Sequence, residues 1–257
     1  CVDCNRHLKF GELVCRARLL DFDHVATGHY ARILPGQDGK QLLFRAADEV
    51  KDQSYFLYGI KKDDLDHLLF PLGELTKEQA RKIALTAGLP VAQRTESQDI
   101  CFVPDGDYRQ VFSQRRISFP GGKIVDQSGT ILGEHRGIAE YTIGQRSGLR
   151  ISAPSPLYVL SIDARSNTVV VGAKEDLFAN GLVASKLNLL ADNWPGVAQA
   201  KIRYRKKPAP CRLSLHENKL TVHFSEAQEA VTPGQSVVFY DGDRVLGGGA
   251  IESVIVG

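Results

Sequence analysis

The sequence predicts an α/β fold followed by β structure, and three observations support this. Residues 9–20 have the spacing of an amphipathic helix and lead into a short predicted strand, 23–27, that ends at Gly28. A helix feeding a strand that stops at a glycine is the αβ step of a parallel sheet. After about residue 118 the chain changes to short β segments, and from about residue 181 apolar residues alternate as in antiparallel strands. A small C-terminal antiparallel barrel accounts for that alternation.

The first part of the chain contains two predicted helices and a hairpin. On the first helix one face collects the apolar residues Leu13, Val14, Ala17 and Leu20. Residues 31–46 are typical of a hairpin that turns at 36–39. Thr76 and Gln79 have the spacing of a capping box, and Gly88 ends the helix that they begin. This second helix leads to the loop that contains Cys101.

Composition restricts the class of protein. The 257 residues carry a formal charge of +2, so any surface that attracts nucleic acid must be local. No apolar run approaches the roughly 20 residues that span a bilayer, which predicts a soluble, cytoplasmic protein without a membrane partner. Five cysteines are few and odd in number, which disfavours a secreted disulfide framework. Because the sequence starts at Cys1 and lacks methionine, we expect a missing N-terminal piece.

The cysteines are the first candidates for chemistry. Cys101 sits between a polar loop and an apolar run, where an accessible thiol can be held as the thiolate, although a structural thiol fits the residues equally well. Cys4 lies just before a helix start, where a thiolate gains from the helix dipole. Cys1 and Cys4 lack the second close pair that a zinc site needs, so no metal is expected. Cys15 and Cys211 fit core positions.

Four cations, Lys201, Arg203, Arg205 and Lys207, alternate along a predicted strand and would share one face. Such a row either follows phosphates or is simply a solvated face of the barrel. Tyr204 beside the charges favours RNA. On residues alone, two functions therefore remain open: a non-catalytic RNA-binding module, and a thiol-disulfide oxidoreductase that uses Cys1 and Cys4.

Five blocks in the same order resemble the tRNA-specific 2-thiouridylases and together cover nearly the whole chain. The blocks are CVDCN with KFG (residues 1–5 and 9–11), ATGHY (26–30), KDQSYFL (51–57), ESQDICF (96–102) and YTIGQR (141–146). The resemblance implies an α/β plus β fold, with the C-terminal part of a parallel-sheet nucleotide (PP-loop) domain over 1–117. A small central β-rich domain would follow over 118–178, and a C-terminal antiparallel β-barrel that contacts tRNA over 179–257.

The resemblance also implies an activity, a sulfurtransferase reaction. The family uses ATP, with Mg²⁺, to adenylate the 2-carbonyl oxygen of the wobble uridine of tRNA and then replaces that oxygen with sulfur. Cys101 would carry the sulfur as a persulfide, and Cys4 would be the second catalytic cysteine. Its attack on the persulfide would either release sulfide or close a Cys4 to Cys101 disulfide as the product leaves. The sulfur would come from a donor protein such as a cysteine desulfurase or a sulfur-relay protein.

Further roles carry over residue by residue. Gly28 matches a nucleotide-contacting glycine, and the matches to positions that contact the anticodon region of tRNA are His29, Lys51, Asp52, Gln53, Arg203, Tyr204 and Gln235. The sequence departs from the family pattern at two points. Cys1 occupies a position where some members have an aspartate proposed as an acid or base. The family's Ser-Gly-Gly-x-Asp-Ser phosphate loop does not occur in these residues, so we expect this chain alone to bind ATP poorly and to be inactive.

Overall fold

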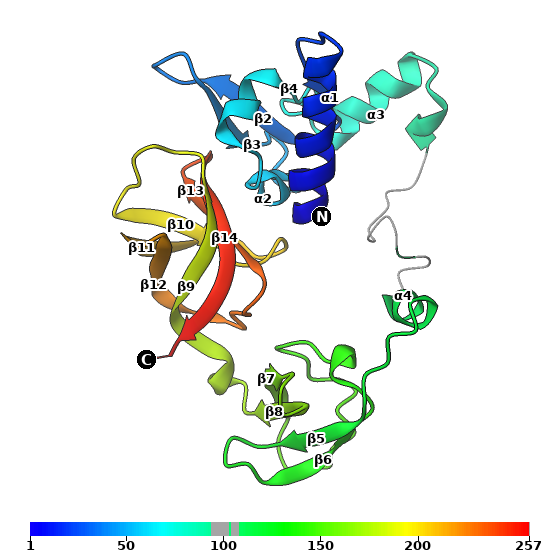
Figure 1. Ribbon diagram of the computed structural model, residues 1–257, viewed down its shortest axis with the longest axis vertical. Coiled ribbons are helices and arrows are strands. Elements are labelled where there is room, and N and C mark those ends of the chain that lie inside the picture. Colours follow the sequence, from blue (N-terminus) through cyan, green and yellow to red (C-terminus); the bar gives the residue numbers. More distant parts are fainter. Residues whose placement is uncertain (94–102, 104–107, 257) are drawn as a thin grey trace. The chain divides into compact units, whose positions relative to one another are not determined.

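The structure is a computed structural model that describes residues 1–93, 103 and 108–256 (Figure 1). Its contacts divide the chain into two compact units. Unit 1 comprises Cys1–Glu96, Leu182–Glu226 and Pro233–Ser253, and unit 2 comprises Ser97–Gly181, Ala227–Thr232 and Val254–Gly257. Unit 1 therefore joins the N-terminal α/β segment to most of the C-terminal strands.

The N-terminal segment of unit 1 begins with one continuous helix. It contains a π-helical stretch, η1 (Cys4–Glu12), that runs into α1 (Leu13–Leu19). Strand β1 (Val25–Ala26) pairs in parallel with β4 (Leu68–Leu69), as the αβ step predicts. Between and after them lie α2 (Ser54–Leu57), η2 (Lys62–His67), α3 (Lys77–Thr86) and η3 (Pro90–Gln93).

Six antiparallel strands of unit 1 close into a barrel, shown in Figure 1. Their order is β13-β10-β11-β12-β9-β14, and β13 pairs back onto β14. The strands are β9 (Phe178–Leu189), β10 (Val197–Lys201), β11 (Ala209–His216), β12 (Lys219–Glu229), β13 (Ser236–Asp241) and β14 (Arg244–Ile255). The hairpin of β2 (Ala31–Pro35) and β3 (Gln41–Arg45) extends the same sheet, because β3 pairs with β14 where Phe44 faces Arg244.

One hydrophobic cluster holds the N-terminal segment and the barrel together. It includes Phe10 and Val14 of the first helix, Leu57 of α2, and Val238 and Tyr240 of β13. The contact is close enough to require glycine: a Cβ atom on Gly248 would lie 2.6 Å from the Tyr58 ring and 2.5 Å from the Val237 carbonyl oxygen. The Tyr58 ring therefore packs directly on the bare backbone of β14.

Unit 2 contains a four-stranded sheet of order β6-β5-β8-β7. Its strands are β5 (Gly122–Val125), β6 (Ile131–His135), β7 (Tyr158–Asp163) and β8 (Thr168–Gly172). The helical turns η5 (Ile138–Glu140) and η6 (Glu175–Leu177) and the helix α4 (Tyr108–Gln114) accompany them. Ile124, Val159, Val169 and Val171 are fully buried and, with Leu149, form its core.

The predicted fold class, α/β plus β with a C-terminal antiparallel barrel, is confirmed. The hairpin over 31–46 is confirmed too. So is the capping box of α3, in which Thr76 and Gln79 exchange side-chain to backbone hydrogen bonds. Among the predicted core cysteines, Cys211 is buried.

Three predictions about side-chain faces are wrong. Cys15 is exposed, because the buried face of the first helix follows Phe10 and Val14 rather than Leu13 and Leu20, which are 45% and 68% exposed. The alternating cation row does not form, because β10 ends at Lys201 and the chain turns over residues 202–206. The four cations therefore do not share one strand face.

Candidate functional site

Cys4 lies near the start of the N-terminal helix, next to residues that contact the 51–58 segment. Its neighbour Asn5 is buried and donates a hydrogen bond from Nδ2 to the Phe56 carbonyl oxygen over 3.1 Å. The Arg6 guanidinium lies 5.8 Å from the centre of the Tyr58 ring. The Cys4 thiol is half-buried and free. It also begins a π-helical stretch, a geometry that is rare and frequently found at functional sites.

Cys101, the predicted partner of Cys4, lies outside the described residues together with the loop around it. Their pairing stays a prediction, and so does the disulfide between them. Within the described part of the chain, no group of three His, Cys, Asp or Glu side chains is placed to hold a metal ion. Nor does that part contain a helix with the length and apolar character needed to cross a membrane.

Gly28 lies two residues after β1, beyond the carboxyl end of a parallel strand, where ligands of α/β sheets gather. It is exposed, and among the described atoms a Cβ built on it would meet only Leu72 Cδ1, at an ordinary 3.6 Å. Packing within unit 1 therefore does not require a glycine here. The residue leaves bare backbone on the side where a ligand can approach closely.

His29 is buried rather than exposed, with 9% of its surface accessible. Its ring packs against Phe10 and Phe70, with centres 5.6 and 5.9 Å away, and Nδ1 lies 2.8 Å from Thr27 Oγ1. Burial, and then the nearby Lys9 ammonium, lower the pKa of His29 to about 4. The imidazole is therefore neutral at pH 7, and any contact with RNA there is a hydrogen bond and not an ion pair.

The buried Asp52 side chain accepts hydrogen bonds from groups at the start of α2. It is 5% exposed, and its Oδ1 accepts hydrogen bonds from the backbone N–H groups of Ala46 (3.2 Å) and Ser54 (3.1 Å). Oδ2 accepts the Ser54 hydroxyl over 2.9 Å. A carboxylate satisfied in this way organises the backbone around it. Its contribution to a ligand site is to position its neighbours.

Gln53 connects two of the predicted site segments. Its Oε1 accepts the Tyr30 N–H over 3.0 Å, while its own N–H donates to the Tyr30 carbonyl oxygen over 2.8 Å. The segment after β1 and the segment before α2 are thereby fixed in register. Lys51 is half-buried, and its backbone N–H donates to the Asp48 carbonyl and carboxylate oxygens.

The chain after β10 adds an aromatic and cationic cluster. The rings of Phe56 and Tyr204 lie 4.4 Å apart, and Tyr55 lies 6.2 Å from Tyr204. The Lys201 ammonium lies 5.4 Å from the centre of the Tyr204 ring and 6.0 Å from that of Tyr55. Burial lowers the pKa of Lys201, and the nearby Asp52 carboxylate opposes that shift. Aromatic faces beside cations are suited to stacking bases and binding phosphates.

Gln235 comes within one residue of the same cluster. It is exposed in the turn before β13, where its carbonyl oxygen accepts the Ile251 N–H. The next residue, Ser236, accepts the Tyr55 hydroxyl at its carbonyl oxygen over 2.9 Å, and its Oγ lies 3.2 Å from the Tyr58 hydroxyl. The structure thus gathers residues 51–53, 203–204 and 235 around Tyr55.

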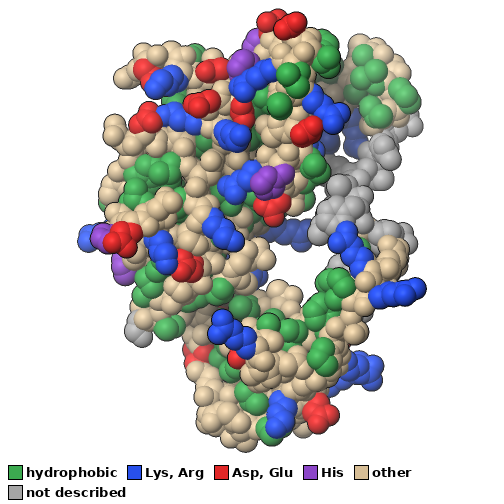
Figure 2. All heavy atoms as spheres, in the orientation of Figure 1, with side chains coloured by type: hydrophobic (Ala, Val, Ile, Leu, Met, Phe, Trp, Pro, Cys, Tyr) green, Lys and Arg blue, Asp and Glu red, His purple; other side chains and the backbone are tan. Residues whose placement is uncertain are grey.

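Lys201, Tyr55 and Phe56 are not among the site residues expected from the sequence. Lys201 is one member of the predicted cation row, and the two aromatic residues belong to the block over 51–57. Only the packing of the barrel against the N-terminal segment brings Tyr204 onto Phe56, so no local pattern predicts the cluster. Figure 2 shows the wider setting: Lys and Arg side chains are spread over the visible face among Asp and Glu, in keeping with the net charge of +2.

Three family models match successive parts of the chain. Residues 1–105 match the tRNA methyl transferase HUP domain, and residues 110–173 match the tRNA methyl transferase PRC-barrel domain. Residues 179–251 match the aminomethyltransferase beta-barrel domain.

Close relatives extend over nearly the whole chain. The tRNA-specific 2-thiouridylase MnmA 1 of Syntrophus aciditrophicus is 50% identical over 255 residues, which are 99% of this chain and 68% of the relative. The enzymes called tRNA-specific 2-thiouridylase MnmA from Geotalea uraniireducens and Carboxydothermus hydrogenoformans are each 48% identical, over 99% and 98% of this chain and 69% and 71% of their own lengths. With half of its residues identical to such an enzyme along almost its entire length, the chain belongs to the tRNA-specific 2-thiouridylase family.

Proposed function

We propose that this protein is a sulfurtransferase that converts the wobble uridine of tRNA to 2-thiouridine. The observation that carries the proposal is the 50% identity to a 2-thiouridylase over 99% of the chain. The convergence of residues 51–53, 203–204 and 235 around Tyr55 supports it, because those segments are far apart in sequence and share a surface suited to RNA.

The chemistry requires activation of a poor leaving group. ATP, with Mg²⁺, supplies it by transferring its adenylyl group to the 2-carbonyl oxygen of uridine, so that the oxygen can depart with AMP. Gly28 fits a nucleotide because its bare backbone stands exposed at the end of β1. In this proposal Gly28 lets a nucleotide approach the backbone closely.

Two cysteines carry the sulfur in the proposed mechanism. Cys101, which lies outside the described residues, receives a sulfur atom from a donor protein and holds it as a persulfide. The terminal sulfur attacks C2 of the activated uridine, and AMP leaves with the former carbonyl oxygen. The Cys4 thiolate then attacks Sγ of Cys101, which breaks the S–S bond, leaves the sulfur on the base and closes a Cys4 to Cys101 disulfide. A dithiol reductant restores both thiols.

In this proposal some of the described residues contact tRNA, and others hold those residues in position. Lys51, Arg203, Tyr204 and Gln235 present cationic, aromatic and amide groups to the RNA, together with Lys201 and Phe56. Asp52 and Gln53 act from inside, because their hydrogen bonds fix the backbone that carries these groups. His29 supports the same surface as a neutral ring behind Gly28.

We further propose a division into three domains over residues 1–117, 118–178 and 179–257. The successive family matches at 1–105, 110–173 and 179–251 support it. The sulfur donor is a cysteine desulfurase or a sulfur-relay protein, and it must reach Cys101.

The test uses the protein as its gene encodes it, expressed in bacteria that lack their own 2-thiouridylase. Mass spectrometry of digested tRNA is expected to detect 2-thiouridine with the wild-type protein and none with Cys4→Ser or Cys101→Ser. Cys15→Ser is the matched control, because this exposed thiol lies on the same helix as Cys4. Normal thiolation by Cys4→Ser would remove Cys4 from the mechanism, and no thiolation by the wild type would refute the function.

A further inference from the structure

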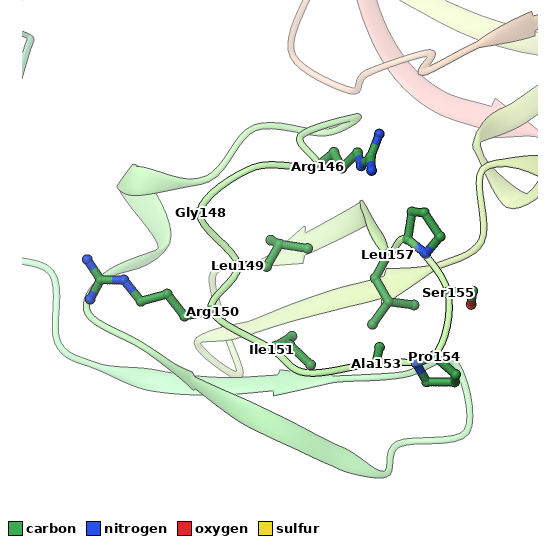
Figure 3. Close-up of a pocket in the computed structure, with 10 residues that line it drawn as sticks. Arg146, Gly148, Leu149, Arg150, Ile151, Ala153, Pro154, Ser155 and Leu157 are labelled. Carbon is green, nitrogen blue, oxygen red and sulfur yellow. The ribbon is translucent and has the colours of Figure 1, made fainter.

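Unit 2 contains a cavity that the proposed site does not use. The long connection from η5 to β7 borders an open recess of about 460 Å³, a volume within the range of small-ligand sites. Figure 3 shows Leu149, Ile151 and Leu157 on the inner side of this loop, with Arg146 and Arg150 leaving it in different directions. Most of the lining residues are exposed, so a polymer can pass across the cavity.

The loop is held rigidly where it carries Arg146. The Gly144 N–H donates to the Val159 carbonyl oxygen over 2.8 Å, and the Val159 N–H returns a bond to the Gln145 carbonyl oxygen over 3.0 Å. The Gln145 side chain accepts the Thr142 N–H and donates to the Ser147 carbonyl oxygen. This turn is therefore pinned to β7 from both sides, and Arg146 extends from a preorganised backbone.

The two arginines on this loop carry uncompensated charge. Both are exposed, and neither forms a hydrogen bond or ion pair with another residue that the structure describes. Arg150 also has a φ of +56°, a backbone conformation that non-glycine residues rarely adopt and that is concentrated at functional sites. Arg18, by contrast, forms an ion pair with Asp64.

We propose that the Arg146–Leu157 loop binds an unstacked nucleotide of the tRNA. The side chains of Leu149, Ile151 and Leu157 contact the base, and Arg146 binds a phosphate next to it. Arg150, whose side chain points away from the recess, binds a phosphate farther along the RNA. RNA is the occupant that the chemistry favours, because exposed guanidinium groups beside leucine and isoleucine side chains can bind phosphates and contact a base. This inference rests on the proposed function and adds a second RNA contact, in unit 2, to the one around Tyr55.

The test measures binding of fluorescently labelled tRNA to the protein as its gene encodes it, by anisotropy, with KCl varied from about 50 to 200 mM. Arg146→Gln/Arg150→Gln should bind more weakly and reduce the slope of log affinity against log salt by about 1.4 to 1.8, the value for two lost phosphate contacts. The control, Arg165→Gln/Lys174→Gln, removes the same charge from exposed residues of unit 2 that do not line the cavity. It should change the slope less.

A second variant tests the recess without changing charge. Ala153→Trp fills part of the cavity and should lower the affinity while leaving the salt slope unchanged. If the parent protein binds tRNA and both variants bind it equally well, this inference is refuted and the proposed function stands. The same conclusion follows if the control double variant weakens binding as much as Arg146→Gln/Arg150→Gln. No binding of tRNA by the parent protein would contradict the proposed function as well.

Discussion

Replacing Asp52 by alanine should destabilise unit 1 by about 3 to 5 kcal/mol. The carboxylate is 5% exposed and accepts three hydrogen bonds, at 2.9 to 3.2 Å, from Ala46 and Ser54. A hydrogen bond to a charged group contributes about 1.5 to 3 kcal/mol, and a buried donor left without an acceptor costs about 1 to 3 kcal/mol. The expected loss is smaller than the sum for three such bonds because the two bonds to backbone N–H groups are long, at 3.1 and 3.2 Å. The substitution also removes the carboxylate that counteracts the lowering of the Lys201 pKa by burial.

The assay is urea unfolding followed by the fluorescence of Trp194, the only tryptophan in the chain. Its ring packs 5.4 Å from Phe239 of β13, so its emission reports on the barrel. Asp52→Asn is the matched control: its amide oxygen keeps both backbone hydrogen bonds, and the expected loss is about 1 to 2 kcal/mol. A loss below about 1 kcal/mol for Asp52→Ala would refute the positioning role. So would unchanged stability combined with weakened tRNA binding.

Two further predictions concern single residues of unit 1. Gly248→Ala should lower the free energy of unfolding by about 2 kcal/mol or more, because its Cβ would lie 2.6 Å from the Tyr58 ring. Gly196→Ala, with open space around it, should be close to neutral, and the urea unfolding assay measures both variants. For His29, the folded pKa of about 4 lies below the usual 6.5, so the unfolded chain binds the proton more readily between these values. Stability should therefore fall by about 3 kcal/mol as the pH drops from 6.5 to 4. His29→Gln should flatten this dependence in urea midpoints, and an identical dependence in both proteins would contradict the assignment.

Local patterns predicted the elements whose causes are local. The capping box at Thr76 and the turn at 36–39 depend on side chains and backbone within a few residues. Alternation along β11, β12 and β13 reflects the two-residue period of a strand, so these strands could be located from the sequence. The same logic placed Gly28 at the end of a parallel strand.

Errors arose where a distant segment decides the outcome. The first helix has apolar residues on more than one side, and contact with Phe70 and with α2 selects the Phe10 and Val14 side, which leaves Cys15 exposed. The cation row failed because β10 stops pairing with β13 after Lys201. Residues 201–207 do not themselves indicate where β10 ends, because a strand ends where its hydrogen-bonded partner strand diverges from it.

The sequence by itself determined the family, the fold class, and the residues on which the chemistry is expected to depend. Only the tertiary structure decided which of these residues are exposed and which support others from within. Asp52 and Gln53 stand beside Lys51 in one motif, yet their hydrogen bonds turn them inward. Tyr204 joins Phe56 although 147 residues separate them, because the closed barrel brings the end of β10 against α2. The physical reason is that burial and contact are properties of surfaces, and those surfaces form only when segments distant in sequence pack together.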